Sequence, residues 1–85
     1  MNGRGHIYEG FSAHEVAFPT RVMGACGIKN LIVTAASGSC NPLFEPSNII
    51  LLKDHINLMG CNSCIGTPFK PMFVNMLNCY DYDCR

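Results

Sequence analysis

The chain has 85 residues, enough for one small domain at most and for only a marginal hydrophobic core. Its formal net charge is zero and only 14% of its residues are charged, so its composition gives no reason to expect a nucleic-acid partner or an anionic membrane surface. No apolar run reaches the roughly 20 residues of a membrane span, and the N-terminus lacks a signal-peptide pattern. We therefore expect a cytoplasmic protein that does not bind membranes.

The segment Gly3–Gly10 concentrates reactive side chains near the N-terminus. If residues 4 to 8 are extended, Arg4, His6 and Tyr8 project from one face, because side chains alternate along a strand. A guanidinium, an imidazole and a phenol in one space suit an oxyanion beside a hydroxylated ligand. The alternative is an exposed edge strand with scattered polar groups.

A helix is predicted to begin directly after this segment. Ser12 and Glu15 have the spacing of a capping box, in which each side chain accepts a hydrogen bond from the other residue's amide. An apolar stripe follows, interrupted by Pro19, which removes one backbone hydrogen bond and is expected to kink the helix. Gly27 supplies the left-handed residue that commonly ends a helix.

Two apolar runs, Leu31–Thr34 and Ile49–Leu52, are predicted to be buried strands. With the first segment they indicate an α/β fold, namely a βαβ unit with parallel strands plus one further strand. We expect residues 1–85 to form one incomplete domain, in which residues 58–85 are a largely irregular tail.

The small residues 35–39 follow the second predicted strand. Their backbone amides can approach a ligand closely, because no large side chain stands in the way. Ligands bind at the carboxyl ends of strands in open α/β sheets, so this loop and Tyr8 are expected at the same sheet edge.

Three motifs stand in order along the chain: GRGHIYEG with the helix SAHEVAFPTRV, then LIVTAASGSCNP, then IILLKDHINLMG. With the tail FVNMLNCYDYDCR they resemble the purine nucleoside phosphorylase family, whose members carry GRFH-x-YEG, TNAAGG-x-NP and DHIN-LMG segments. The resemblance covers almost the whole chain, and four ordered motifs are far more specific than any single one. It implies that the chain is part of a three-layer α/β/α phosphorylase-like domain, as a fragment or a degenerate relative.

What the resemblance implies is a pentosyltransferase of purine salvage. Inorganic phosphate attacks the anomeric carbon of a purine ribonucleoside and releases the free base and ribose 1-phosphate. By the family's motif, Arg4, His6 and the backbone of Ala36 hold phosphate, with His6 as the catalytic residue. Tyr8 lies against the ribose. The implied partners are a purine nucleoside and phosphate, without a metal or a further cofactor, and a homo-oligomer is compatible with the family.

The chain also departs from the family pattern. Gly5 replaces Phe, Ala35 replaces Asn, and Ser37 and Ser39 replace Ala and Gly. The family's GPNDERFG loop is reduced to residues 66–70. The family's glycine-rich phosphate loop and its purine-binding residues have no counterpart in the 85 residues, so we expect the isolated chain not to turn over nucleoside.

Two other interpretations remain open from the sequence. Cys61, Cys64, Cys79 and Cys84 have the spacing C-x2-C-x14-C-x4-C, which is close to that of a zinc ribbon and indicates a small zinc-binding module. A non-catalytic interaction fragment is the other, because an incomplete sheet exposes strand edges and an apolar face.

Overall fold

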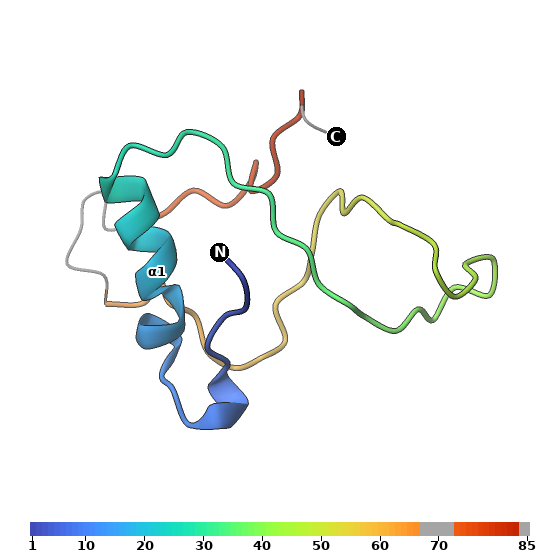
Figure 1. Ribbon diagram of the computed structural model, residues 1–85, viewed down its shortest axis with the longest axis horizontal. Helices are drawn as coiled ribbons and strands as arrows, with labels where there is room; N and C mark the ends of the chain where they lie inside the picture. Colours follow the sequence, from blue (N-terminus) through green and yellow to red (C-terminus); the bar gives the residue numbers. More distant parts are fainter. Residues whose placement is uncertain (67–72, 84–85) are drawn as a thin grey trace.

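The computed structural model describes residues 1–66 and 73–83, and in these residues it contains one short 3₁₀-helix and one α-helix. The 3₁₀-helix η1 spans Ile7–Glu9, and the α-helix α1 spans Ala13–Ala25. Figure 1 shows α1 at one side of the molecule, with the rest of the chain running as loops around and beyond it. The predictions of the sequence analysis that concern residues 67–72 and 84–85 fall outside the described residues.

The predicted α/β fold is wrong for this structure, because the described residues form no strand and no sheet. The first predicted strand ends in η1, and the runs Leu31–Thr34 and Ile49–Leu52 have no regular structure. A strand is stable only when a neighbour supplies its backbone hydrogen bonds and another layer covers its apolar face. Neither run finds such a neighbour among the described residues, so β-branched and apolar composition alone does not produce a strand.

Helix α1 begins where the sequence predicts. The Ser12 amide donates to the Glu15 carboxylate over 2.7 Å, and the Glu15 amide donates to the Ser12 hydroxyl oxygen over 3.3 Å. Both partners of the capping box are therefore present, and they satisfy two backbone donors that a helix N-terminus leaves without intrahelical partners.

The end of α1 is a Schellman motif centred on Gly27. This glycine has a φ of +84°, and its amide donates to the Gly24 carbonyl over 3.0 Å. The Ile28 amide reaches back to the Met23 carbonyl over 3.2 Å. These two bonds are the pair that defines the motif, and the left-handed conformation explains why glycine occupies the position.

Replacing Ser12 with alanine is expected to shorten or melt α1, because the helix loses its side-chain cap. The cost is about 1 kcal/mol of helix stability. Far-ultraviolet circular dichroism on the whole chain measures the loss of helix. Ser37→Ala is the matched control, since Ser37 lies in an irregular exposed loop, and an equal loss of helix in that variant would contradict the assignment.

Helix content is also expected to depend on pH through Glu15. The Ser12 amide, and then the Ser12 hydroxyl, hold the pKa of the Glu15 carboxyl below its ordinary value of 4.5. A lowered pKa in the folded state means that the carboxylate stabilises the helix above about pH 4.5, and that this contribution is lost as pH falls through the folded-state value. A circular-dichroism titration of Glu15→Gln should lack this acid step, whereas Glu45→Gln, in a turn outside α1, should retain it.

No side chain is fully buried among the described residues, so the chain has no hydrophobic core there. The radius of gyration is 14.8 Å, compared with about 12 Å for a compact domain of this length. The accessible surface is 8248 Å², against roughly 5000 Å² for a compact protein of this mass. No described helix has the length and apolar character to cross a membrane.

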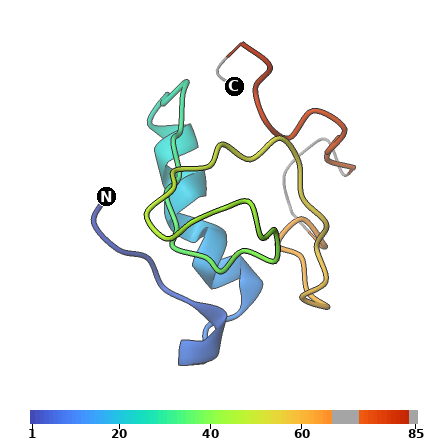
Figure 2. The same ribbon diagram turned by 90° about the vertical axis from the view of Figure 1, so that its right-hand side faces the viewer.

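Local turns shape the long loop between α1 and the third predicted run. Asn41 closes one turn, with its side-chain oxygen accepting from the Leu43 amide and its carbonyl accepting from the Phe44 amide. Asn48 closes the next by exchanging two hydrogen bonds with Glu45. The segment of residues 41–48 that contains these turns lies on the side away from α1 in Figure 1, and that side faces the viewer in Figure 2.

Two contacts join segments that are distant in sequence. The Arg21 guanidinium donates to the Ser63 carbonyl over 2.7 Å and so connects α1 to the loop at residues 61–65. The Tyr80 hydroxyl lies 3.1 Å from Nδ1 of His55, and their rings meet edge to face at 5.7 Å. The contact with Tyr80 gives His55 a structural hydrogen-bonding role.

Candidate functional site

His6 lies at the centre of the candidate site, immediately before η1. Its backbone is extended, with φ −127° and ψ 151°, and its amide donates to the Glu9 carboxylate over 2.8 Å. The imidazole Nδ1 is also 2.8 Å from the same carboxylate oxygen. Residues 6 to 9 thus repeat the spacing of Ser12 and Glu15 six residues earlier in the chain, with the Glu9 carboxylate accepting from the His6 amide as Glu15 does from Ser12.

The Glu9 carboxylate determines which ring nitrogen of His6 carries the hydrogen. An ionised carboxylate is only an acceptor, so Nδ1 of His6 must carry the hydrogen in this contact. The other nitrogen, Nε2, is then free to accept a hydrogen bond when the ring is neutral and to donate one when it is protonated. Both side chains are a little under half exposed, at 45% for His6 and 44% for Glu9, so a ligand from solvent can reach the pair.

Tyr8 lies beside the imidazole. The two rings are stacked, with centroids 4.8 Å apart and an angle of 20° between their planes. Tyr8 is 83% exposed, so its ring offers an open apolar surface next to the histidine. The sequence expectation that these two side chains share one space therefore agrees with their positions, although a turn and not a strand brings them together.

Arg4 and Ala36 make no contact with this group among the described residues. Both are exposed, and no hydrogen bond, ion pair or ring contact within the described residues joins either to His6. The expected convergence at one sheet edge depended on the sheet, which is absent from the described residues. Their phosphate-binding roles stay predictions.

Gly5 allows a close approach that a larger residue would block. A Cβ atom there would stand 3.3 Å from two atoms of the Phe11 ring, which is tighter than ordinary contact. Phe11 thus places an aromatic ring beside Gly5, the position where the family pattern has Phe.

Glu9 is the residue of this group that the sequence interpretation left without a role. The available signal was the spacing of His6 and Glu9, which equals that of Ser12 and Glu15. Histidine is not a usual capping residue, so this spacing alone does not predict the contact.

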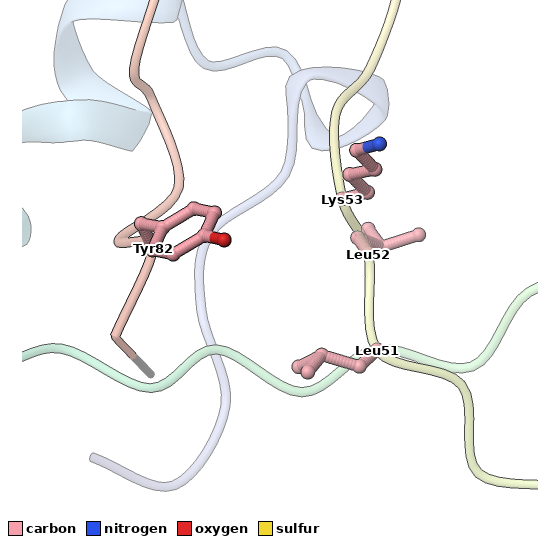
Figure 3. A pocket seen from close by; sticks show the side chains of 4 residues that line it. All are labelled: Leu51, Leu52, Lys53 and Tyr82. Atoms are coloured by element: carbon pink, nitrogen blue, oxygen red, sulfur yellow. The ribbon is translucent and has the colours of Figure 1, made fainter. Parts of the chain in front are cut away.

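A hollow elsewhere in the molecule does not match this chemistry. It has a volume of about 270 Å³ and is lined by Leu51, Leu52, Lys53 and Tyr82. Figure 3 shows Tyr82 facing the segment of residues 51–53 across this space. Its walls are mostly apolar, and none of its lining residues belongs to the segment Gly3–Gly10.

The cysteines of the zinc hypothesis are only partly described. Cys61 and Cys64 are partly buried and Cys79 is exposed, while Cys84 lies outside the described residues. Among the described residues, no group of three or more His, Cys, Asp or Glu side chains could hold a metal ion.

Comparisons with a family model and with individual known proteins point to the same family. Residues 2–85 match the family described as "Phosphorylase superfamily". The chain is 45% identical over 86 residues to purine nucleoside phosphorylase 1 of Bacillus subtilis, covering 98% of this chain and 32% of that protein. It is 53% identical over 66 residues to purine nucleoside phosphorylase 1 of Geobacillus stearothermophilus, covering 78% of this chain and 24% of that protein.

A mammalian relative gives the same picture: purine nucleoside phosphorylase of Mus musculus is 43% identical over 93 residues, covering 100% of this chain and 32% of that protein. The chain therefore spans about a third or less of the length of the curated relatives it matches. No solved structure matches it significantly.

Proposed function

Because this chain belongs to the phosphorylase superfamily through its match over residues 2–85, we propose that it carries the phosphate-binding and ribose-binding part of a purine nucleoside phosphorylase. The proposed reaction is attack of inorganic phosphate on the anomeric carbon of a purine ribonucleoside, giving the free base and ribose 1-phosphate. The single observation that carries the proposal is the group formed by His6, Glu9 and Tyr8 inside the GRGHIYEG motif.

His6 is proposed to bind the phosphate through Nε2. With Nδ1 occupied by the Glu9 carboxylate, Nε2 can accept a hydrogen bond from a protonated phosphate oxygen or, when the ring is charged, donate one to an anionic oxygen. Phosphate near neutral pH offers both kinds of oxygen. Glu9 acts as a positioning residue, since it fixes the orientation of the ring without needing to touch the ligand.

Arg4 and the Ala36 amide are proposed to complete the phosphate contacts. The Arg4 side chain is exposed, and a guanidinium binds phosphate oxygens through paired hydrogen bonds. The Ala36 amide makes no hydrogen bond within the described part of the chain, and it lies among small residues that leave its surroundings open.

Tyr8 is proposed to lie against the ribose. Its ring is held in place by stacking on His6 and exposes its surface to solvent. Since the transition state of glycosidic cleavage resembles an oxocarbenium ion, the reaction depends on holding phosphate and sugar in line and on placing negative charge near the ring carbon. Phosphate is the only co-substrate that the proposal requires.

Purine salvage in the cytoplasm is the proposed setting. Ribose 1-phosphate is charged and does not cross a membrane unaided, so an enzyme that recovers both the base and the sugar acts where both can be used. Assembly into a homo-oligomer is compatible with the proposal, but no step of the reaction described here depends on it.

A chimera tests the proposal. Residues 2–85 replace the matching third of the Bacillus subtilis relative, and release of hypoxanthine from inosine is measured with and without phosphate. Phosphate-dependent cleavage by the chimera is expected, with none above background for the isolated 85-residue chain. A chimera that elutes from gel filtration at the size of its parent and shows no phosphate-dependent cleavage would contradict the proposal.

A further inference from the structure

Two asparagines organise the loop that carries Cys61 and Cys64. The Asn57 side chain accepts from the Met59 amide over 3.0 Å and donates to the Cys61 carbonyl over 3.0 Å. The Asn62 side chain accepts from the Cys64 amide over 2.8 Å. Each cysteine thus has its backbone held by one asparagine side chain, in a stretch that contains neither helix nor strand.

The loop doubles back between the two cysteines. A turn closes from Asn62 to Ile65, whose amide donates to the Asn62 carbonyl over 3.2 Å. Cys61 immediately precedes this turn, and Cys64 is its third residue. The turn itself brings Asn62 and Ile65 together. Cys61 and Cys64 flank the start of this bend with only two residues between them, so closing a disulfide between them orders little additional chain.

The same loop is connected to α1. The Arg21 guanidinium donates to the carbonyl of Ser63, one of the two residues between the cysteines. Cys61, Ser63 and Cys64 are partly buried, whereas every residue from 24 to 60 is exposed. The cysteine pair therefore lies in a more enclosed part of the irregular chain, beside a residue that contacts α1.

We propose that Cys61 and Cys64 are a redox-modifiable pair that closes into a reversible intramolecular disulfide by exchange with a low-molecular-weight disulfide. Both thiols are free in the structure. Two cysteines separated by two residues form the arrangement found in thiol–disulfide exchange sites. This inference concerns a site separate from the proposed phosphate group and does not depend on the proposed function.

The exchange proceeds in two balanced steps. One cysteine thiolate attacks a sulfur of the external disulfide RSSR, forms a mixed disulfide and releases RS⁻. The second thiolate then attacks the protein sulfur of that mixed disulfide, closes the Cys61–Cys64 bond and releases a second RS⁻. The two protons lost by the cysteines are taken up by the two leaving thiolates. Overall, two protein thiols are oxidised and RSSR is reduced to two RSH.

The test uses the full 85-residue chain with its other four cysteines, Cys26, Cys40, Cys79 and Cys84, changed to serine. The protein is equilibrated with mixtures of reduced and oxidised glutathione, quenched with acid and weighed by mass spectrometry. The closed form is lighter than the dithiol by two hydrogens. We expect its effective thiol concentration to exceed by about tenfold or more that of a matched variant that retains only Cys26 and Cys40, because a long flexible loop closes less readily.

A further comparison separates the effect of the turn on the effective thiol concentration from the effect of the short spacing between the cysteines. Asn62→Ala removes the hydrogen bond to the Cys64 amide and is expected to lower the effective concentration about fivefold, the weight of one ordinary hydrogen bond. Concentrated urea should lower the effective concentration of the unchanged pair by the same factor. The proposal is overturned if the pair yields only mixed disulfides with glutathione, or if neither Asn62→Ala nor urea changes the effective concentration.

Discussion

Replacing His6 with alanine is expected to lower kcat/KM for phosphate-dependent inosine cleavage by the chimera about 100-fold or more, the usual contribution of a positioned acid–base group. The imidazole is the one side chain of the site whose ring is fixed on two sides, by the Glu9 carboxylate at 2.8 Å and by the Tyr8 ring at 4.8 Å. Steady-state rates at varied phosphate concentration measure the effect, which should include a higher KM for phosphate.

His14→Ala is the matched control for this variant. His14 is also an exposed histidine, but it lies in the first turn of α1, where its ring is 3.4 Å from the Arg21 guanidinium. Its removal should change kcat/KM by less than about twofold, as is usual for surface positions. Equal losses in the two variants would show that histidine removal acts through folding, and would contradict the assigned role of His6.

Replacing Pro19 with alanine is expected to stabilise α1 by up to about 3 kcal/mol, the difference between the two residues inside a helix. Pro19 lies in the middle of Ala13–Ala25 and has no amide hydrogen to donate to the preceding turn. The alanine variant restores that donor and removes the clash of the ring with the helix backbone. Circular dichroism of the full chain should show more helix and a slower loss of helix on heating.

Pro42→Ala tests whether this gain is specific to the helix. Pro42 lies in the turn after Asn41, outside any regular element. Its replacement should leave the helix signal unchanged. A gain of similar size in both variants would mean that proline removal favours helix throughout the chain. The gain from Pro19→Ala could then not be assigned to α1.

The parts of the structure that sequence predicts are those fixed by neighbours in the chain. Ser12 and Glu15 determine where α1 begins, and Gly27 determines where it ends, because each acts on backbone groups three to five residues away. The turns at Asn41 and Asn48 are likewise closed by contacts two or three residues away, whereas the start and the end of α1 are what the sequence predicts. These predictions needed no knowledge of what lies elsewhere in the molecule.

The predicted strands failed because their stability is not local. Leu31–Thr34 and Ile49–Leu52 have the composition of buried strands, yet Ile32 remains 91% exposed. Burial and pairing depend on partners far away in sequence, and the described residues supply none to either run. Composition therefore shows what such a run would do beside a partner, and not whether the partner is present.

The candidate site shows the same difference between predictions that depend on local geometry and predictions that depend on distant segments. His6 and Tyr8 are two residues apart, and local geometry is enough to bring their rings together. Arg4 was expected to join them on one face of a strand and Ala36 at the edge of a sheet, and the described residues form neither a strand nor a sheet. Glu9 could have been found by applying the capping-box spacing to a histidine, since that pattern is also local.

The lack of buried side chains also has a calorimetric consequence. A compact 85-residue domain gains about 1.0 to 1.3 kcal/mol/K of heat capacity on unfolding, because water comes to surround apolar groups that were enclosed. Among the described residues no apolar side chain is buried, so far less apolar surface is left to become hydrated. Heating should therefore give a gradual loss of α1 without a sharp heat-absorption peak, and the heat capacity of the chain should rise smoothly through the whole range.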